Sequence, residues 1–437
     1  MSKLWFVALA VLIFGCSSSS SDSDADPGGA SGAGAPSRAG ASGNSAGAPN
    51  SSAGAPNTPN TAGAPSTAGA PSTAGAPNSA GAPSSAGAPN AAGAPSSAGA
   101  SNTAGAPGTA GSAGTGTTSG DFWVAPDGAD TNPGTEAKPF QTVPYAIARL
   151  TAGLTLWVKA GTYKVTAVVS IKKVGTAAAP FTIAAAPGAR PVVDFATPAG
   201  VRGFDITGDY WRIKGLEVKN ASDNCIAIAG SHNIIDNLVI HHCGDTGLQI
   251  TVSSSLALDQ TRGADNLILD TDSYENFDAA TGGENADGFA AKLRIGAGNV
   301  FRGCRAYNNA DDGWDLFAAD DVVLIENCWA FLNGKGVNGS NPAGDGNGFK
   351  LGGKPTSEGE GGAVHLLKNC FAFENLTCGY TQNSNPEVPK LSACGAKDNK
   401  TDYCQTLSKS GEVSMTMSAA AAKAAPRNAD GSLPPMK

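Results

Sequence analysis

The sequence predicts an all-β fold, a parallel β-helix (solenoid) in which short strands stack coil upon coil, over residues 121–437. Two sets of residue columns predict it, because a solenoid repeats the same residue types once per coil. In the first set a glycine is followed by a large apolar residue, and apolar and polar residues then alternate with the period of a half-buried strand. These pairs are Gly247-Leu248, Gly288-Phe289, Gly313-Trp314, Gly348-Phe349 and Gly379-Tyr380.

The second set of columns lies upstream of the glycines. Its cysteines, Cys304 with Cys328 and Cys370 with Cys394, recur after about 24 residues, which gives the length of one coil. We expect these four as buried fillers of an inward stack. Aromatic residues follow three positions later and are expected to stack inside. Two positions further on, asparagines predict a ladder of side-chain amides joining successive coils. The aromatic column is His241, Tyr274, Tyr307, Phe331 and Phe373, and the ladder is Asn276, Asn309, Asn333, Asn375 and Asn399.

Both ends of the solenoid and its cross-links also have sequence signals. Residues 139–150 predict a short N-terminal capping helix, and the tail from residue 419 to 437 is expected to cover the other end. The remaining cysteines allow two disulfides, for which we expect the pairs Cys378–Cys404 and Cys225–Cys243.

The N-terminus predicts export. Residues 1–15 form a signal peptide with an apolar run from Leu4 to Phe14, and Cys16 follows it as in a bacterial lipobox. We expect Cys16 to carry a lipid that anchors the exported chain to a bacterial membrane. The expected location is the outer membrane or cell surface, or else the protein is secreted. An ordinary signal peptide with an incidental cysteine is the alternative. Residues 16–120 are rich in Ala, Gly, Pro and Ser, which predicts a disordered linker without a core.

The charge of the chain limits its partners. A net charge of -8 argues against nucleic acid, so an acidic substrate would need a local cationic site. Nothing in the sequence indicates an oligomer, and we expect a monomer that meets the membrane through its lipid alone.

Outward residues beside the glycines predict chemistry. Asp287 and Asp312 take equivalent places on successive coils, about 4.8 Å apart, and Asp311 and Asp315 lie beside them. Four carboxylates this close repel one another unless a cation neutralises them, and oxygen ligands in irregular geometry suit Ca²⁺. Lys350 falls one coil from Asp315 in the same column. The alternatives are that the Asp-Gly pairs are only turn sequences and that Lys350 is a solvated surface charge.

Three motifs together resemble family 9 of the polysaccharide lyases, a group of pectate lyases. They are NADGFAAK at residues 285–292, ADDGWDL at 310–316 and GDGNGFKLG at 344–352. The stretch from Phe122 to Tyr163 is similar to the start of that family. The resemblance implies a right-handed β-helix lyase that cleaves pectate or another polygalacturonate-type acidic polysaccharide by β-elimination to 4,5-unsaturated products.

The resemblance also assigns roles to residues. It implies that Asp287, Asp311, Asp312 and Asp315 bind calcium and that Lys350 is the base. By strand parity Lys292 and Arg294 point outward and are expected to clamp substrate carboxylates, or else are solvated cations. Two other functions stay open: a β-helix hydrolase that uses paired carboxylates, and a non-catalytic surface protein that binds polysaccharide.

Overall fold

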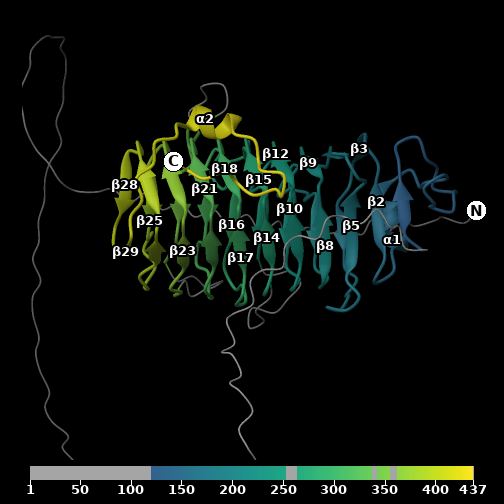
Figure 1. Cartoon of the computed structure of the whole chain (residues 1–437), viewed down its shortest axis with the longest axis horizontal. Helices are drawn as coiled ribbons and strands as arrows, with labels where there is room; N and C mark the ends of the chain where they lie inside the picture. The colour runs from purple at the N-terminus through teal and green to yellow at the C-terminus, as the bar shows by residue number, and fades with distance from the viewer. Residues whose placement is uncertain (1–119, 252–262, 337–341, 355–361, 437) are drawn as a thin grey trace, which may run out of the picture. The chain divides into compact units, whose positions relative to one another are not determined.

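The computed structural model describes residues 120–251, 263–336, 342–354 and 362–436. Their strands form three parallel sheets, and a strand pairs with the equivalent strand of the next coil (Figure 1). This confirms the predicted parallel β-helix. The predicted signal peptide, Cys16 and the linker up to residue 119 lie outside the described residues.

The three sheets run the length of the domain, and each strand is only two to five residues long. In order, sheet A has β1 (Phe122–Val124), β2 (Thr155–Val158), β5 (Phe181–Ala185), β8 (Trp211–Lys214), β11 (Ile234–Asp236), β14 (Leu267–Leu269), β17 (Val300–Arg302), β20 (Leu324–Glu326), β23 (Leu366–Lys368), β26 (Lys390–Ser392) and β29 (Ser408–Ser410). Sheet B has β3 (Thr162–Val165), β6 (Val192–Phe195), β9 (Glu217–Lys219), β12 (Val239–His241), β15 (Asp272–Tyr274), β18 (Arg305–Tyr307), β21 (Trp329–Phe331), β24 (Phe371–Phe373) and β27 (Gly395–Lys397). Sheet C has β4 (Val169–Ile171), β7 (Phe204–Ile206), β10 (Ile226–Ile228), β13 (Leu248–Ile250), β16 (Phe289–Ala291), β19 (Trp314–Asp315), β22 (Phe349–Lys350), β25 (Cys378–Thr381) and β28 (Thr401–Cys404).

We call the glycines of the first set of columns, from Gly247 to Gly379, the anchor glycines. The large apolar residues that follow them line the interior, as predicted. Phe289, Trp314, Phe349 and Tyr380 are fully buried. Their rings stack on one another with centroids 4.8–5.0 Å apart. The four column cysteines are also buried and free, so they fill the interior without cross-linking it.

Asparagine ladders tie the coils together along two corners. In the predicted ladder each amide binds the next, and the Asn276 Nδ2 to Asn309 Oδ1 distance is 2.9 Å. A second ladder, which the sequence analysis missed, runs through Asn233, Asn266 and Asn299. These bonds satisfy buried backbone donors at every turn, which a solenoid corner requires.

The aromatic column of sheet B lies outside, and the prediction that it stacks inside is wrong. Each of these strands has three residues, and its middle residue, such as Ala306, faces the interior. The rings still stack on one another: the centroids of Tyr307 and Phe331 lie 4.9 Å apart. The C-terminal segment covers them, with Met415, Ala419 and Ala422 packed against the rings.

That C-terminal segment contains the second helix. We expected residues 419–437 to cover the end of the solenoid, and this prediction is wrong, because the segment packs against sheet B. Helix α2 (Ala419–Ala424) begins at Ser418, whose side chain accepts a hydrogen bond from the Ala421 amide at 3.3 Å. In Figure 1 α2 lies beside the middle strands β15, β18 and β21 of sheet B. The guanidinium of Arg305 donates to the carbonyls of Ala422 and Ala425, at 3.0 and 2.9 Å, which fixes the segment to β18.

The predicted N-terminal capping helix is present as α1 (Val143–Arg149). A proline in its first turn suits a helix start, and its buried face joins the interior core next to β1 and β2. Neither helix in the described part of the chain is long and apolar enough to cross a membrane.

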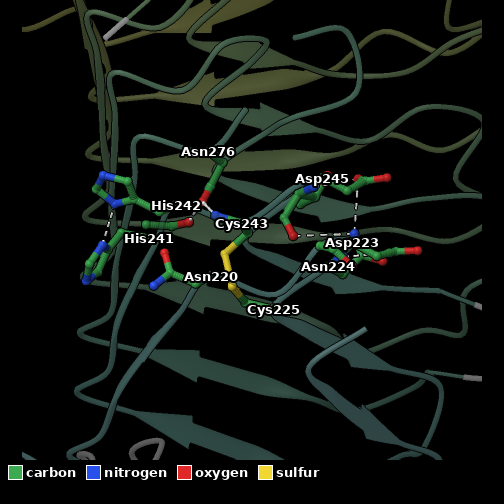
Figure 2. The surroundings of a disulfide bond; sticks show 12 residues. Asn220, Asp223, Asn224, Cys225, His241, His242, Cys243, Asp245 and Asn276 are labelled. Atoms are coloured by element: carbon green, nitrogen blue, oxygen red, sulfur yellow. Dashed lines mark hydrogen bonds between the residues drawn. A yellow bond between two sulfur atoms is a disulfide. The ribbon is translucent and has the colours of Figure 1, made fainter. Parts of the chain in front are cut away.

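Both predicted disulfides form, Cys225–Cys243 and Cys378–Cys404. Figure 2 shows Cys243 beside Asn276, whose Oδ1 accepts a hydrogen bond from the Cys243 amide at 3.1 Å. Cys243 therefore holds the place of an asparagine at the first rung of the predicted ladder. Its partner Cys225 holds the place of the anchor glycine on the coil before.

Candidate metal and active site

The candidate site lies at sheet C, on β16, β19 and β22 of three successive coils and on the residues that flank these strands. The pairing of Phe289 with Trp314 puts Asp287 and Asp312 at equivalent places, as predicted. The glycine after each aspartate is required by close packing. A Cβ on Gly313 would lie 2.5 Å from the Gly348 carbonyl oxygen.

Three carboxylates, Asp287, Asp311 and Asp312, form what we call the carboxylate trio. Each offers an oxygen that lies within 4.8 Å of the others, and all three side chains are buried. Backbone amides hold one oxygen of each in place. The Asp312 amide donates to Asp287 Oδ1 at 3.2 Å, and the amides of Asp345 and Asn347 donate to Asp311 and Asp312, both at 2.6 Å.

Two lysines complete the site. The ammonium of Lys350 lies 3.4 Å from Asp312 Oδ2 and 3.1 Å from Asp345 Oδ2, and its side chain is only 12% exposed. The ammonium of Lys292 lies 2.9 Å from Asp287 Oδ2 and 2.7 Å from Asp315 Oδ2. The structure thus brings together the four predicted aspartates and both lysines. The other predicted cation, Arg294, follows β16 and is half-buried.

The electrostatics of the trio differ from those of Asp315. Burial raises the pKa of Asp312 well above its usual range, and the neighbouring Asp311 raises it further against the opposing charge of Lys350. Burial also raises the pKa values of Asp287 and Asp311. For Asp315 burial acts in the same direction, but Lys292 and Lys350 outweigh it and lower the pKa.

The trio fits a hard divalent cation. Oxygen-only donors in irregular geometry are the ligands that Ca²⁺ accepts. Asp312 Oδ2 is buried and accepts no hydrogen bond from the residues described, and its ion-pair partner is the Lys350 ammonium at 3.4 Å. Asp315 Oδ2 is paired with the Lys292 ammonium.

The sequence analysis missed three further residues at the site. Thr246 Oγ1 donates to Asp287 Oδ2 at 2.9 Å, Asn347 holds Asp312, and Asp345 contacts Lys350. Thr246 and Asn347 lie in the same column as Asp287 and Asp312, so their place was visible in the sequence. The role of Asp345 depends on a loop conformation that no column predicts.

The chain matches the family model described as "Pel9A-like, right handed beta helix region" over residues 122–416. It is 39% identical over 292 residues to pectate lyase L of Paenibacillus polymyxa, covering 64% of each chain. It is 36% identical over 310 residues to pectate lyase PEL9 of Emericella nidulans, covering 64% of this chain and 73% of that one. The chain thus spans less than two thirds of the length of the Paenibacillus relative.

Two solved structures have the same fold. The crystal structure of pectate lyase Pel9A is 32% identical with a TM-score of 0.63, over 72% of this chain and 87% of that chain. A rhamnogalacturonan lyase is 25% identical with a TM-score of 0.62, over 72% and 95%. The fold is therefore the right-handed β-helix that the three motifs led us to expect. The chain belongs to the Pel9A-like right-handed β-helix family, which confirms the resemblance to family 9 of the polysaccharide lyases.

Proposed function

We propose that the domain is a calcium-dependent lyase that cleaves a polygalacturonate-type polyuronate by β-elimination. The observation that carries the proposal is the position of Lys350, one coil beyond Asp315 and with its ammonium at the rim of the carboxylate trio. An amine beside a site for a divalent cation suits the removal of a proton next to a carboxylate. The relatives named pectate lyase support this substrate class.

In this mechanism the carboxylate trio and Asp315 hold the cation, and Lys350 is the base. When bound, calcium supplies the positive charge that makes the C5 proton of a bound uronate more acidic. The Lys350 amine takes that proton, and the C5–H electron pair becomes the C4–C5 double bond. The C4–O bond breaks, its electrons leave with the oxygen, and that oxygen takes a proton from solvent.

Lys350 must be neutral to accept the proton. Burial lowers its pKa, but the carboxylates of Asp315 and Asp312 outweigh burial and raise the pKa well above its usual value. The fraction of neutral amine therefore increases with pH, and we expect the elimination rate to rise toward the alkaline side.

The test is to incubate the protein with polygalacturonate and calcium and to follow the ultraviolet absorbance of unsaturated uronates. A lyase produces the absorbance together with new chain ends. A hydrolase would give reducing ends without the absorbance, and a binding protein would give neither. Either of these results would refute the proposal.

We also propose that the chain is exported and anchored by lipid on Cys16, which lies outside the described residues. The two disulfides support export, because such bonds persist in oxidising compartments. Metabolic labelling with a radioactive fatty acid should label the parent and not Cys16→Ser. Equal labelling of both would refute the anchor.

A further inference from the structure

Lys292 lies inside the candidate metal site and does not project into solvent. Its ammonium bridges Asp287 Oδ2 at 2.9 Å and Asp315 Oδ2 at 2.7 Å, and these two aspartates come from successive coils. The lysine side chain is 14% exposed, and the two carboxylates are 0% and 4% exposed. A desolvated ammonium between two carboxylates is a strong contact, because little water screens it.

The oxygens that Lys292 contacts are the ones a cation would need. The other oxygen of each carboxylate already accepts a backbone hydrogen bond. The Asp312 amide donates to Asp287 Oδ1 at 3.2 Å, and the Phe317 amide donates to Asp315 Oδ1 at 2.9 Å. The Oδ2 atoms accept no backbone hydrogen bond, and Lys292 contacts both of them. Asp287 Oδ2 also accepts a hydrogen bond from Thr246 Oγ1 at 2.9 Å.

The charges point the same way. Five carboxylates, counting Asp345, and two lysines share the site, which leaves it acidic even when both lysines are charged. Three of those carboxylates crowd together in the trio. Lys292 is the cation that connects this crowded trio, through Asp287, with Asp315.

We infer that Lys292 is the built-in counter-ion of the metal-free site and that it competes with calcium for Asp287 and Asp315. The inference rests on the calcium site of the proposed function. Lys292 lowers the affinity of the site for calcium and stabilises the fold while the metal is absent. Removing the ammonium leaves more negative charge at the site, so calcium binds more tightly. Without calcium, Asp287 and Asp315 then lack their counter-ion, which destabilises the fold.

The experiment is calcium titration by calorimetry on the parent, Lys292→Met, Lys292→Gln and Lys292→Arg. We expect Lys292→Met and Lys292→Gln to bind calcium at least tenfold more tightly than the parent, and Lys292→Arg to bind within a few-fold of it. The matched control is Lys214→Met. Lys214 also pairs with an aspartate of the next coil, Asp236 at 2.8 Å, but on sheet A. Its removal should leave the calcium affinity unchanged.

Thermal melts give a second readout that does not depend on catalysis. Without calcium, the melting temperature of Lys292→Gln should fall below that of the parent, and saturating calcium should close most of the gap. Lys292→Gln is included because its amide can still bind Asp315 if the apolar variant fails to fold.

Equal or weaker calcium binding by Lys292→Gln would overturn the inference, because it would mean that the ammonium arranges the carboxylates for the metal. A parent that binds no calcium would overturn the metal site as well. A parent that binds calcium but yields no unsaturated uronate would refute the lyase and leave the competition measurable.

Discussion

Lys350 and Asp315 occupy the same outward position on adjacent coils, paired directly between β22 and β19. Lys350→Ala removes the proposed base and leaves every predicted calcium ligand in place. We expect the elimination rate to fall by about 10²- to 10⁴-fold with calcium binding retained. Lys350→Arg should not restore the rate, since a guanidinium keeps its proton. The measurement is rate against pH at saturating calcium, and a variant with a tenth of the parent rate and the same alkaline limb would assign the base elsewhere.

Asp312→Asn tests the trio. The substitution keeps the shape of the side chain and removes one buried negative charge beside Asp311. Calcium binding should weaken by at least tenfold, because a carboxylate ligand and its charge are both lost. Without calcium the variant should melt no lower than the parent, since repulsion within the trio is relieved. Asp236→Asn on sheet A is the control and should bind calcium as the parent does. Unchanged binding by Asp312→Asn would exclude it as a ligand.

The Cys225–Cys243 disulfide stands where later coils have a glycine and an asparagine. Replacing both cysteines with alanine should lower the free energy of unfolding by about 3 kcal/mol, as expected for a loop of 18 residues. The pair Cys225→Gly with Cys243→Asn should recover part of this loss by extending the ladder. The glycine is needed as well, because a Cβ on the equivalent Gly247 would lie 2.8 Å from Asn276 Nδ2. Denaturant unfolding compares the variants, and a recovered pair no more stable than the alanine pair would disprove the equivalence.

His365 lies in the column of the second asparagine ladder, two coils beyond Asn299, and we expect it to make stability depend on pH. Its Nδ1 accepts the Val323 amide at 3.2 Å, and burial lowers the His365 pKa from 6.5 to about 4. Between these values the unfolded chain binds more protons than the folded one, so stability falls as pH drops from about 6.5 to 4, by on the order of 3 kcal/mol. His365→Asn should keep a hydrogen bond to the Val323 amide and remove this part of the pH dependence. Unfolding free energies at pH 7 and 4.5 decide it, and an unchanged slope would place the acid sensitivity elsewhere.

Much of the fold could be predicted because a solenoid repeats its side-chain roles. The anchor glycines, the interior rings such as Trp314 and the ladder of Asn309 were each visible as columns, and the structure places all of them as expected. The aromatic column of Tyr307 was assigned to the wrong face. Large apolar residues indicate burial without saying against what, and here the cover is a segment more than 100 residues further along the chain.

The positions of the site residues were predictable from the same repeat, but their side-chain contacts were not. Columns placed Asp287, Asp312, Asp315 and Lys350 on one face, which the strand register bears out. The alternation of residues along the strand predicted that Lys292 points out of the β-helix. It could not show that the Lys292 ammonium contacts Asp315. That contact depends on side-chain conformation and charge, whereas a column of matching residues predicts only the backbone position of each residue.

The C-terminal segment alters how this domain folds. Contacts in a solenoid are mostly between neighbouring coils, so such a domain can assemble coil by coil and fray from its ends. Arg427 binds Asp272 across 155 residues of sequence, and Arg305 binds Ala422 across 117. We call these two contacts the C-terminal clasp, and we expect it to form only after the segment that holds Ala422 and Arg427 has been synthesised. It then links the last residues of the chain to β15 and β18, and unravelling from the C-terminal end must release this clasp before those coils are exposed.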